Sequence, residues 1–125
     1  MDSTLQWKSE NRGRMSLKVK ESGSHIVVYL NGRMDVHLAS EIENELNDII
    51  QKNNQKSIVL NLDDVEYMSS SGLRVFVSLM RTLKESNRNL KLCNLSLAVR
   101  KVFEVVELMD MFDIYESEEE ALAGE

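Results

Sequence analysis

Three consecutive serines, Ser69-Ser70-Ser71, are the residues of this chain best suited by type and spacing to do chemistry. Gly72 follows them, and the acidic residues Asp63, Asp64 and Glu66 lie shortly before them. A serine hydroxyl is a nucleophile when an adjacent base activates it, and it accepts a phosphoryl group when a kinase supplies one. The segment therefore raises two possibilities, an active-site nucleophile and a phosphorylation site.

The sequence offers little that would activate a nucleophile. His25 and His37 are the only histidines, and neither lies in a segment with the features of a site. A P-loop, a Gly-x-Gly-x-x-Gly run and a nucleophile elbow are all absent. We therefore expect no catalytic residues, no metal site and no cofactor. An enzyme or nucleotide-binding domain that uses the loop 69–73 is the alternative from another functional class, and incubation with ATP or ester substrates in the absence of partners would distinguish it.

The single cysteine, Cys93, lies in the apolar-alternating run Leu90-Lys91-Leu92-Cys93. This pattern predicts a buried structural thiol, and one cysteine forms no internal disulfide. No pair of histidine and cysteine residues has the spacing of metal ligands.

The elements that position the serines follow from the hydrophobic pattern. Alternation predicts two strands, at 16–20 and 25–30, joined by a turn into an antiparallel hairpin. Helical spacing begins at Leu38, and a near-continuous apolar run at 57–62 predicts a strand buried in a parallel sheet. The remaining elements are an acidic loop, a helix that opens at Gly72, a strand at 90–93, a helix capped by Ser96, a short strand at 112–115 and a terminal helix with capping-box residues Ser117 and Glu120.

The resulting order, β-β-α-β-α-β-α-β-α, predicts an α/β domain with a mixed, mostly parallel sheet and helices packed against it. We expect residues 15–125 to form this single domain and residues 1–14 to be a polar, flexible extension. A segment that docks through Trp7 is the alternative for this extension. The residues expected in the core are Val59, Leu60, Phe76, Val77, Met80 and Phe103.

The chain has 125 residues, a net charge of −6 and 42% hydrophobic residues. A negative chain is a poor partner for nucleic acid, which binds basic surfaces. No apolar run approaches the roughly 20 residues of a membrane-spanning helix, and the first 14 residues lack the apolar stretch of a signal peptide. We therefore expect a cytoplasmic protein with protein partners. Much of the negative charge lies in residues 116–120, where a solvated helix start is expected.

Ser71 is expected to cap the helix that opens at Gly72, since its hydroxyl would accept from an amide of the first turn. Replacing such a cap by Ala costs ~1 kcal/mol. The same position favours an anion, because free amides and the positive end of the helix dipole meet there. A phosphate on Ser71 would add roughly −1.5 to −2 charges beside the acidic loop and repel a partner that accepts the neutral form.

The segment that contains Ser70-Ser71-Gly72-Leu73 resembles the signature of STAS domains in bacterial anti-sigma factor antagonists. The similarity covers residues 16–123. It includes Leu30-Asn31-Gly32-Arg33-Met34-Asp35, the segment Leu92–Ser96 that leads into Val99-Arg100-Lys101-Val102-Phe103, and the following residues 108–114. The family's usual aspartate before the serine pair is Ser69 in this chain.

The resemblance implies partner switching. The unphosphorylated protein would bind an anti-sigma factor that is also a GHKL-type serine kinase, phosphorylation of Ser71 would end that binding, and a metal-dependent serine phosphatase would restore it. Ser70 and Ser69 are the alternative phosphorylation sites. A STAS module in a non-sigma regulatory, secretion or lipid-transport complex is the alternative function. The residues expected to bind the partner are Met34, Asp35, Met68, Ser69, Ser70, Gly72, Leu73 and Arg74.

Overall fold

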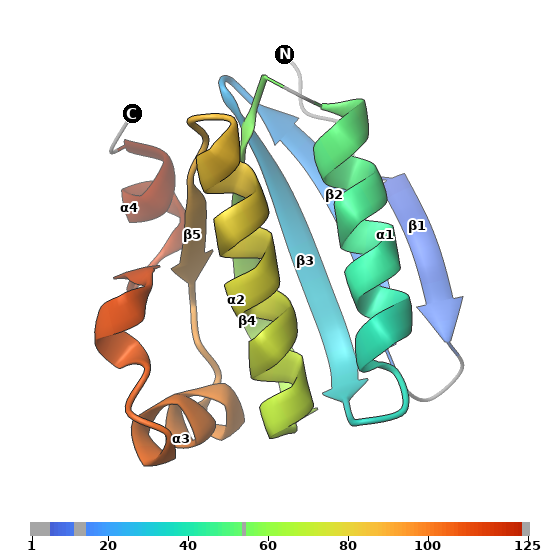
Figure 1. Cartoon of the computed structure of the whole chain (residues 1–125), viewed down its shortest axis with the longest axis vertical. Helices are drawn as coiled ribbons and strands as arrows, with labels where there is room; N and C mark the ends of the chain where they lie inside the picture. Colours follow the sequence, from blue (N-terminus) through green and yellow to red (C-terminus); the bar gives the residue numbers. More distant parts are fainter. Residues whose placement is uncertain (1–5, 12–14, 54, 124–125) are drawn as a thin grey trace.

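Figure 1 shows the computed structural model of the chain. Its strands give way to helices where the hydrophobic spacing of the sequence changes from alternating to helical. The structure describes the backbone of residues 6–11, 15–53 and 55–123, and side chains from residue 17 onward. The strands are β1 (Gln6–Asn11), β2 (Met15–Ser22), β3 (His25–Met34), β4 (Ser57–Met68), β5 (Leu90–Cys93) and β6 (Asp113–Tyr115). The helices are α1 (Ala39–Lys52), α2 (Ser70–Glu85), α3 (Leu97–Val105) and α4 (Glu118–Ala123), with a 3-10 turn, η1 (Met109–Met111).

The strands form one sheet in the order β1-β2-β3-β4-β5-β6. The pairs β1/β2 and β2/β3 are antiparallel, whereas β3/β4, β4/β5 and β5/β6 are parallel. Each parallel pair is connected through a helix, as parallel neighbours require. The prediction of an α/β domain with a mixed, mostly parallel sheet is therefore confirmed. Because β3, β4 and β5 run in the same direction, their carboxyl ends lie at the same edge of the sheet.

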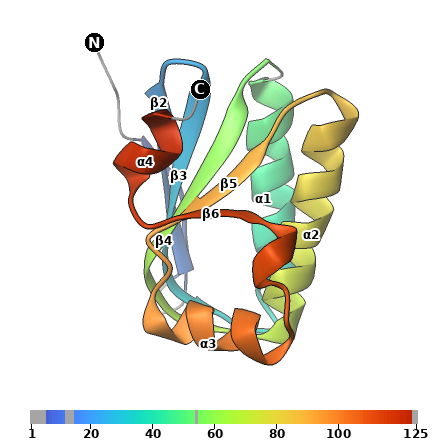
Figure 2. The same ribbon diagram turned by 90° about the vertical axis from the view of Figure 1, so that its left-hand side faces the viewer.

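Helices α1 and α2 cover one face of the sheet, and the short helix α4 lies on the opposite face (Figure 2). The main core lies under α1 and α2, where Phe76 and Phe103 are fully buried and their rings pack against one another. A smaller cluster of Val59, Cys93 and Ala121 fills the space under α4. Of the residues predicted in the core, Val59, Leu60, Phe76 and Phe103 are buried, and Val77 and Met80 are half-buried at its border. In the described part of the chain, no helix is both long and apolar enough to span a membrane.

The N-terminal segment differs from the prediction. No strand was expected before residue 15, yet Gln6–Asn11 pair antiparallel with β2, from Gln6 opposite Val19 to Asn11 opposite Met15. An edge strand pairs through its backbone with one neighbouring strand. This pairing does not require the alternating apolar residues by which a strand is predicted from a sequence. The alternative that the segment docks through Trp7 concerns a side chain outside the described residues.

Strands β3 and β4 are also longer than predicted. The acidic stretch after residue 62 was expected to be a loop, but β4 continues to Met68 and pairs in parallel with β3 as far as Met34. Asp63 and Asp64 are exposed, while Val65 and Met68 are buried, so this extension keeps an apolar side despite its acidic residues. The longer strands bring Met68 and Met34 opposite each other immediately before the three serines.

Candidate functional site

Ser69, rather than Ser71, is the N-cap of helix α2. The Ser69 backbone is extended, and its hydroxyl accepts a hydrogen bond from the amide of Gly72 at 3.3 Å. The Ser69 amide donates to the carbonyl oxygen of Met34 at 3.0 Å, which ties the helix start to the end of β3. The predicted cap at Ser71 is therefore wrong, because the helix begins before Gly72 and Ser71 already lies in its first turn.

Gly72 allows α2 to approach the sheet closely. A Cβ atom at this position would lie 3.0 Å from Met68 Cγ, 3.2 Å from Met34 Sδ and 3.3 Å from Met34 Cγ. Both methionines are buried at the ends of the paired strands β4 and β3. The glycine thus serves close packing of the helix start, which fixes the position of the serines over this edge of the sheet.

Ser70 and Ser71 carry hydroxyls that the fold does not use. Ser70 is exposed and Ser71 is half-buried, and neither hydroxyl has a hydrogen-bond partner among the described residues. Their backbone amides belong to the first turn of α2, where a helix supplies no acceptor of its own. We call Ser69–Ser71, with the adjoining ends of β3 and β4, the serine edge. It has two hydroxyls and two amides that lack a partner among the described residues, at the positive end of a helix dipole, which is suited to hold an anion.

Apolar side chains that the sequence did not single out lie at the same edge of the sheet. Val36 is 59% exposed just beyond β3, and Tyr67 is 40% exposed near the end of β4, with the Arg33 guanidinium 4.6 Å from its ring centroid. Leu97 is 68% exposed at the start of α3, beside Ser96, whose hydroxyl donates to the Val65 carbonyl at 2.7 Å. A sequence pattern does not separate exposed apolar residues from core residues, which is why these three were missed.

The profile of the STAS domain family matches residues 16–121. The chain belongs to the STAS domain family. It is similar to the anti-sigma-B factor antagonist of Bacillus subtilis, with 33% identity over 100 residues that cover 80% of this chain and 90% of that protein.

Two solved structures share the fold. An anti-sigma factor antagonist from Mycobacterium paratuberculosis matches with a TM-score of 0.80 and 19% identity, covering 93% of this chain and 97% of that one. The Bacillus cell fate determinant SpoIIAA in its phosphorylated form matches with a TM-score of 0.60 and 25% identity, covering 96% of this chain and 97% of that one. The resemblance inferred from the serine motif is therefore confirmed at the level of the family.

The residues predicted to bind a partner divide into two groups in this STAS domain. Ser70 and Arg74 are exposed, and Asp35 and Ser69 are half-buried. Asp35 also has a local role, because its carboxylate accepts from the amides of His37 and Leu38 at 3.0 and 3.1 Å. The four others are buried beneath the edge: Met34, Met68, Gly72 and Leu73.

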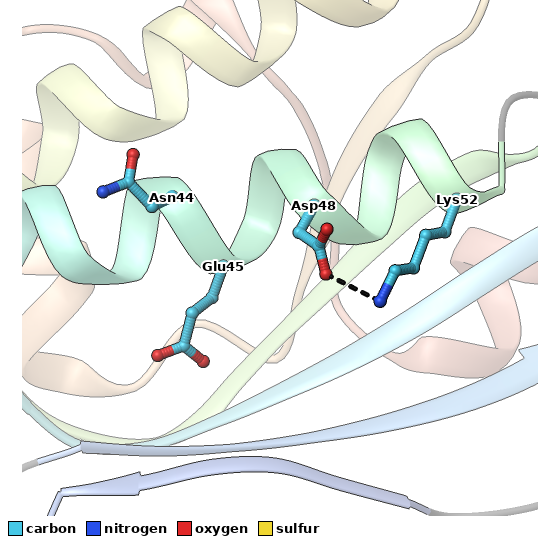
Figure 3. A pocket seen from close by; sticks show the side chains of 4 residues that line it. All are labelled: Asn44, Glu45, Asp48 and Lys52. Atoms are coloured by element: carbon cyan, nitrogen blue, oxygen red, sulfur yellow. Dashed lines mark ion pairs between the residues drawn. The ribbon is translucent and has the colours of Figure 1, made fainter.

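A shallow groove of about 470 Å³ runs along α2 from Arg74, one turn after the serines. Val77, Ser78, Arg81 and Thr82 complete its lining, so two exposed arginines flank it. A second hollow, of about 410 Å³, lies along α1 and is lined by Asn44, Glu45, Asp48 and Lys52 (Figure 3). Asp48 and Lys52 form an ion pair there at 3.1 Å, and the lining contains no nucleophile with an adjacent base.

The remaining candidates for chemistry lie away from the serine edge or are inert. Burial raises the pKa of the Cys93 thiol to about 12, so the thiol is protonated and unreactive at neutral pH. The buried thiol expected from the sequence is confirmed. Across residues 6–11, 15–53 and 55–123, no three His, Cys, Asp or Glu side chains gather in a way that would hold a metal ion.

A second polar group of side chains lies on the opposite face of the sheet, under α4. The Glu118 carboxylate accepts from Lys20 Nζ at 2.7 Å, from the Tyr29 hydroxyl at 2.9 Å and from Asn61 Nδ2 at 3.1 Å. We call these four residues the Glu118 cluster. The sequence predicted a solvated helix start here. The capping by Ser117 is confirmed, with its hydroxyl accepting from the Glu120 amide at 3.2 Å, but Glu118 is half-buried and links α4 to three strands.

The pKa values within the Glu118 cluster reflect this pairing. Burial alone would raise the pKa of Glu118, but the hydrogen bonds from Lys20, Tyr29 and Asn61 outweigh it and hold the pKa below its ordinary value. The hydrogen bond to Glu118 raises the pKa of Lys20, against the effect of burial. The cluster is thus most stable when the carboxylate and the ammonium are both charged.

Proposed function

We propose that this STAS domain is an anti-sigma factor antagonist that works in the cytoplasm by partner switching. In the unphosphorylated state it binds an anti-sigma factor that is also a GHKL-type serine kinase, and the sigma factor is released. Phosphorylation of Ser71 ends the complex, and a metal-dependent serine phosphatase restores the binding form. The observation that carries the proposal is the pair of hydroxyls, Ser70 and Ser71, held at the start of α2 without a hydrogen-bond partner in the described part of the chain.

The proposed modification is a phosphoryl transfer in which the partner supplies ATP and its metal ion. The Ser71 hydroxyl oxygen forms a bond to the γ-phosphorus, the bond between that phosphorus and the β–γ bridging oxygen breaks, ADP leaves, and the hydroxyl proton passes to a base of the kinase. The phosphate would then lie next to the free amides of the first turn. The amides of Gly72 and Leu73 are not available to it, since both donate to Ser69.

Electrostatics explains why the modified form would dissociate. The phosphate adds roughly −1.5 to −2 charges to a surface that already has Asp63, Asp64 and Glu66 exposed on β4. An interface that had accepted a neutral serine would then face uncompensated negative charge, and like charges opposite each other cost several kcal/mol. The names of the relatives support this reading, because one is an anti-sigma-B factor antagonist and another structure is of a phosphorylated form.

The direct experiment maps phosphate on the protein isolated from its native cells, by intact mass and peptide sequencing. We expect one phosphoryl group on Ser71. In reactions with the cognate kinase, Ser71→Ala should resist modification and bind the kinase persistently, whereas the control variant Ser70→Ala should still be phosphorylated. Full phosphorylation of Ser71→Ala would refute the assignment and transfer it to Ser70.

Partner identity is tested separately. Native partners purified with the Ser71→Ala variant should include a protein with both kinase and sigma-binding domains. A complex of secretion or lipid-transport proteins without such a kinase would contradict the proposed sigma pathway and favour the alternative STAS module. The phosphate mapping can therefore refute the phosphorylation site, and the partner purification can refute the sigma pathway, each without the other.

A further inference from the structure

The stretch from the end of α3 through η1 exposes three apolar side chains. Val105 is 81% exposed, Val106 is 39% exposed and Met111 is 47% exposed. Both ends of the segment are fixed beneath it, since Phe103 and Phe112 are buried and their ring centroids lie 5.5 Å apart. The chain between these rings is thus held at both ends, with Leu108 and Met109 packed against the core and Val105, Val106 and Met111 exposed. We call residues 104–111 the α3–η1 surface.

Backbone hydrogen bonds keep this surface compact. The Leu108 amide donates to the Phe103 carbonyl at 3.0 Å, and the Met111 amide donates to the Leu108 carbonyl at 3.1 Å. These bonds fold back the chain between the exposed valines and Met111. Isolated exposed apolar residues need no explanation, but three within a seven-residue turn indicate a contact surface.

The charged residues of the α3–η1 surface are all acidic. Glu104, Glu107 and Asp110 are exposed and make no ion pair or hydrogen bond through their carboxylates within the described part of the chain. From residue 102 onward the sequence has nine acidic residues and no Lys or Arg. The cations of α3 are the half-buried Arg100 and the exposed Lys101, which lies one turn before Val105 on the same face of the helix. Exposed apolar and acidic side chains on one short segment fit a ligand that is apolar and basic.

Two features of the surface cost stability in the isolated domain. Glu107 has φ 59°, a left-handed conformation that favours Gly or Asn and that a Glu side chain rarely adopts. In addition, Glu104 lies in the last turn of α3 and Glu107 lies just beyond it, at the negative end of the helix dipole, where acidic residues are unfavourable. A bound cation would relieve the second cost.

We propose that the α3–η1 surface is a docking site for a basic segment of a protein partner, anchored by a bulky apolar side chain between flanking Lys or Arg residues. Charge complementarity selects this occupant. A second copy docked symmetrically would bring the same carboxylates together, and an anionic membrane would be repelled. The surface shares no residue with the serine edge, so the proposal does not depend on phosphorylation.

The test uses synthetic amphipathic helical peptides with leucines on one face and lysines on the other. Backbone amide NMR shifts should change at residues 101–112, and calorimetry should give a dissociation constant. A peptide with the leucines replaced by serine, at the same charge, should bind at least about tenfold more weakly. A peptide with glutamate in place of lysine should not bind. If the amide shifts change near every acidic residue of the domain, including those of α4, the peptide binds by charge alone and the proposal is overturned.

Matched variants of the domain make the test specific. Val105→Ser and Glu107→Gln should each weaken binding of the leucine–lysine peptide, by about tenfold and several-fold respectively. Glu119→Gln removes an equal charge from an exposed position of α4 and should leave binding unchanged. Equal affinities for Val105→Ser and the unsubstituted domain would refute the site, as would an equal loss for Glu119→Gln.

Glu107→Gly separates binding from stability. Removing the strained side chain should raise Tm by about 4 °C, because glycine adopts this backbone conformation freely, and should at the same time weaken peptide binding. A rise in Tm with unchanged affinity would refute a binding role for Glu107. Sedimentation of the domain alone should show no concentration-dependent association, and association abolished by Val105→Ser would contradict the proposed partner.

Discussion

The serine edge and the Glu118 cluster are both polar regions, and they differ in how the fold satisfies their polar groups. The Glu118 carboxylate accepts three hydrogen bonds from three strands. The hydroxyls of Ser70 and Ser71 have no partner among the described residues, although the Ser69 hydroxyl beside them accepts from the Gly72 amide. Paired polar groups hold α4 to the sheet, whereas unpaired groups at the start of α2 are available for a partner or a phosphate. The difference separates residues that maintain the fold from residues that we propose to bind a partner or accept a phosphate.

The largest effect on stability is expected at the Glu118 cluster. Glu118→Ala should lower the free energy of unfolding by about 2 kcal/mol, because Lys20, Tyr29 and Asn61 lose a shared acceptor in a partly buried place. Urea denaturation measures the change. Glu119→Ala in the same helix is the control, and as an exposed residue it should change stability by less than about 0.5 kcal/mol. Equal effects of the two substitutions would show that the cluster does not hold α4.

Gly72→Ala tests the packing that positions the serine edge. The added methyl group would meet Met68 Cγ at 3.0 Å and Met34 Sδ at 3.2 Å, so we expect a net loss of about 1 kcal/mol in spite of the better helix propensity of alanine. Thermal unfolding measures it. In a double-mutant cycle with Met68→Ala, the loss should shrink, because the nearest clashing atom is removed. A stabilised Gly72→Ala protein would contradict the close packing.

The serines themselves should differ in their effect on stability. Ser69→Ala should cost about 1 kcal/mol, since it removes the hydroxyl that accepts from Gly72. Ser71→Ala should change the free energy of unfolding by less than about 0.5 kcal/mol. Chemical denaturation of the two variants side by side gives the comparison. A larger loss of stability for Ser71→Ala than for Ser69→Ala would show that Ser71 is the cap. The distinction between Ser69 as a structural residue and Ser71 as a residue free for modification would then be lost.

The pH dependence of stability should reside in the Glu118 cluster. The pKa of Glu118 is below its ordinary value of 4.5, so its contribution is complete above that value and is lost as the pH falls through the lower folded pKa. The pKa of Lys20 is raised above 10.5, so its contribution is lost only as the pH rises beyond that range. Glu118→Gln should therefore flatten the acid side of the stability profile. An unchanged acid limb would contradict this assignment.

From residue 15 onward the order of strands and helices could be predicted, because the hydrophobic period changes from one element to the next. The buried run at 57–62 and the capping residues Ser96 and Ser117 gave local signals that the structure follows. The strand β1 and the extension of β4 to Met68 could not be predicted in this way. Both depend on pairing with a neighbouring strand, and the acidic residues Asp63 and Asp64 resemble those of a loop.

The candidate site was predicted in its location but not in its detail. Three adjacent serines are chemically equivalent in the sequence, and only the start of α2 distinguishes the cap, Ser69, from the two available hydroxyls. The Glu118 cluster was missed because Lys20 and Glu118 are 98 residues apart, and no local pattern links them. Exposed Tyr67 and Leu97 were missed because apolar type alone does not reveal exposure.

The proposed switch is tested most directly by measuring folding and binding on the same two samples. One is the unphosphorylated domain, and the other is the domain phosphorylated on Ser71 or carrying Ser71→Asp. Tm should change by less than about 4 °C, since the added charge lies at the positive end of α2 and outside the core. Affinity for the kinase partner should fall more than about 100-fold, which corresponds to a cost of about 3 kcal/mol. A modified domain that binds as tightly as the unmodified one, or that unfolds, would contradict a switch that acts through the surface of the serine edge.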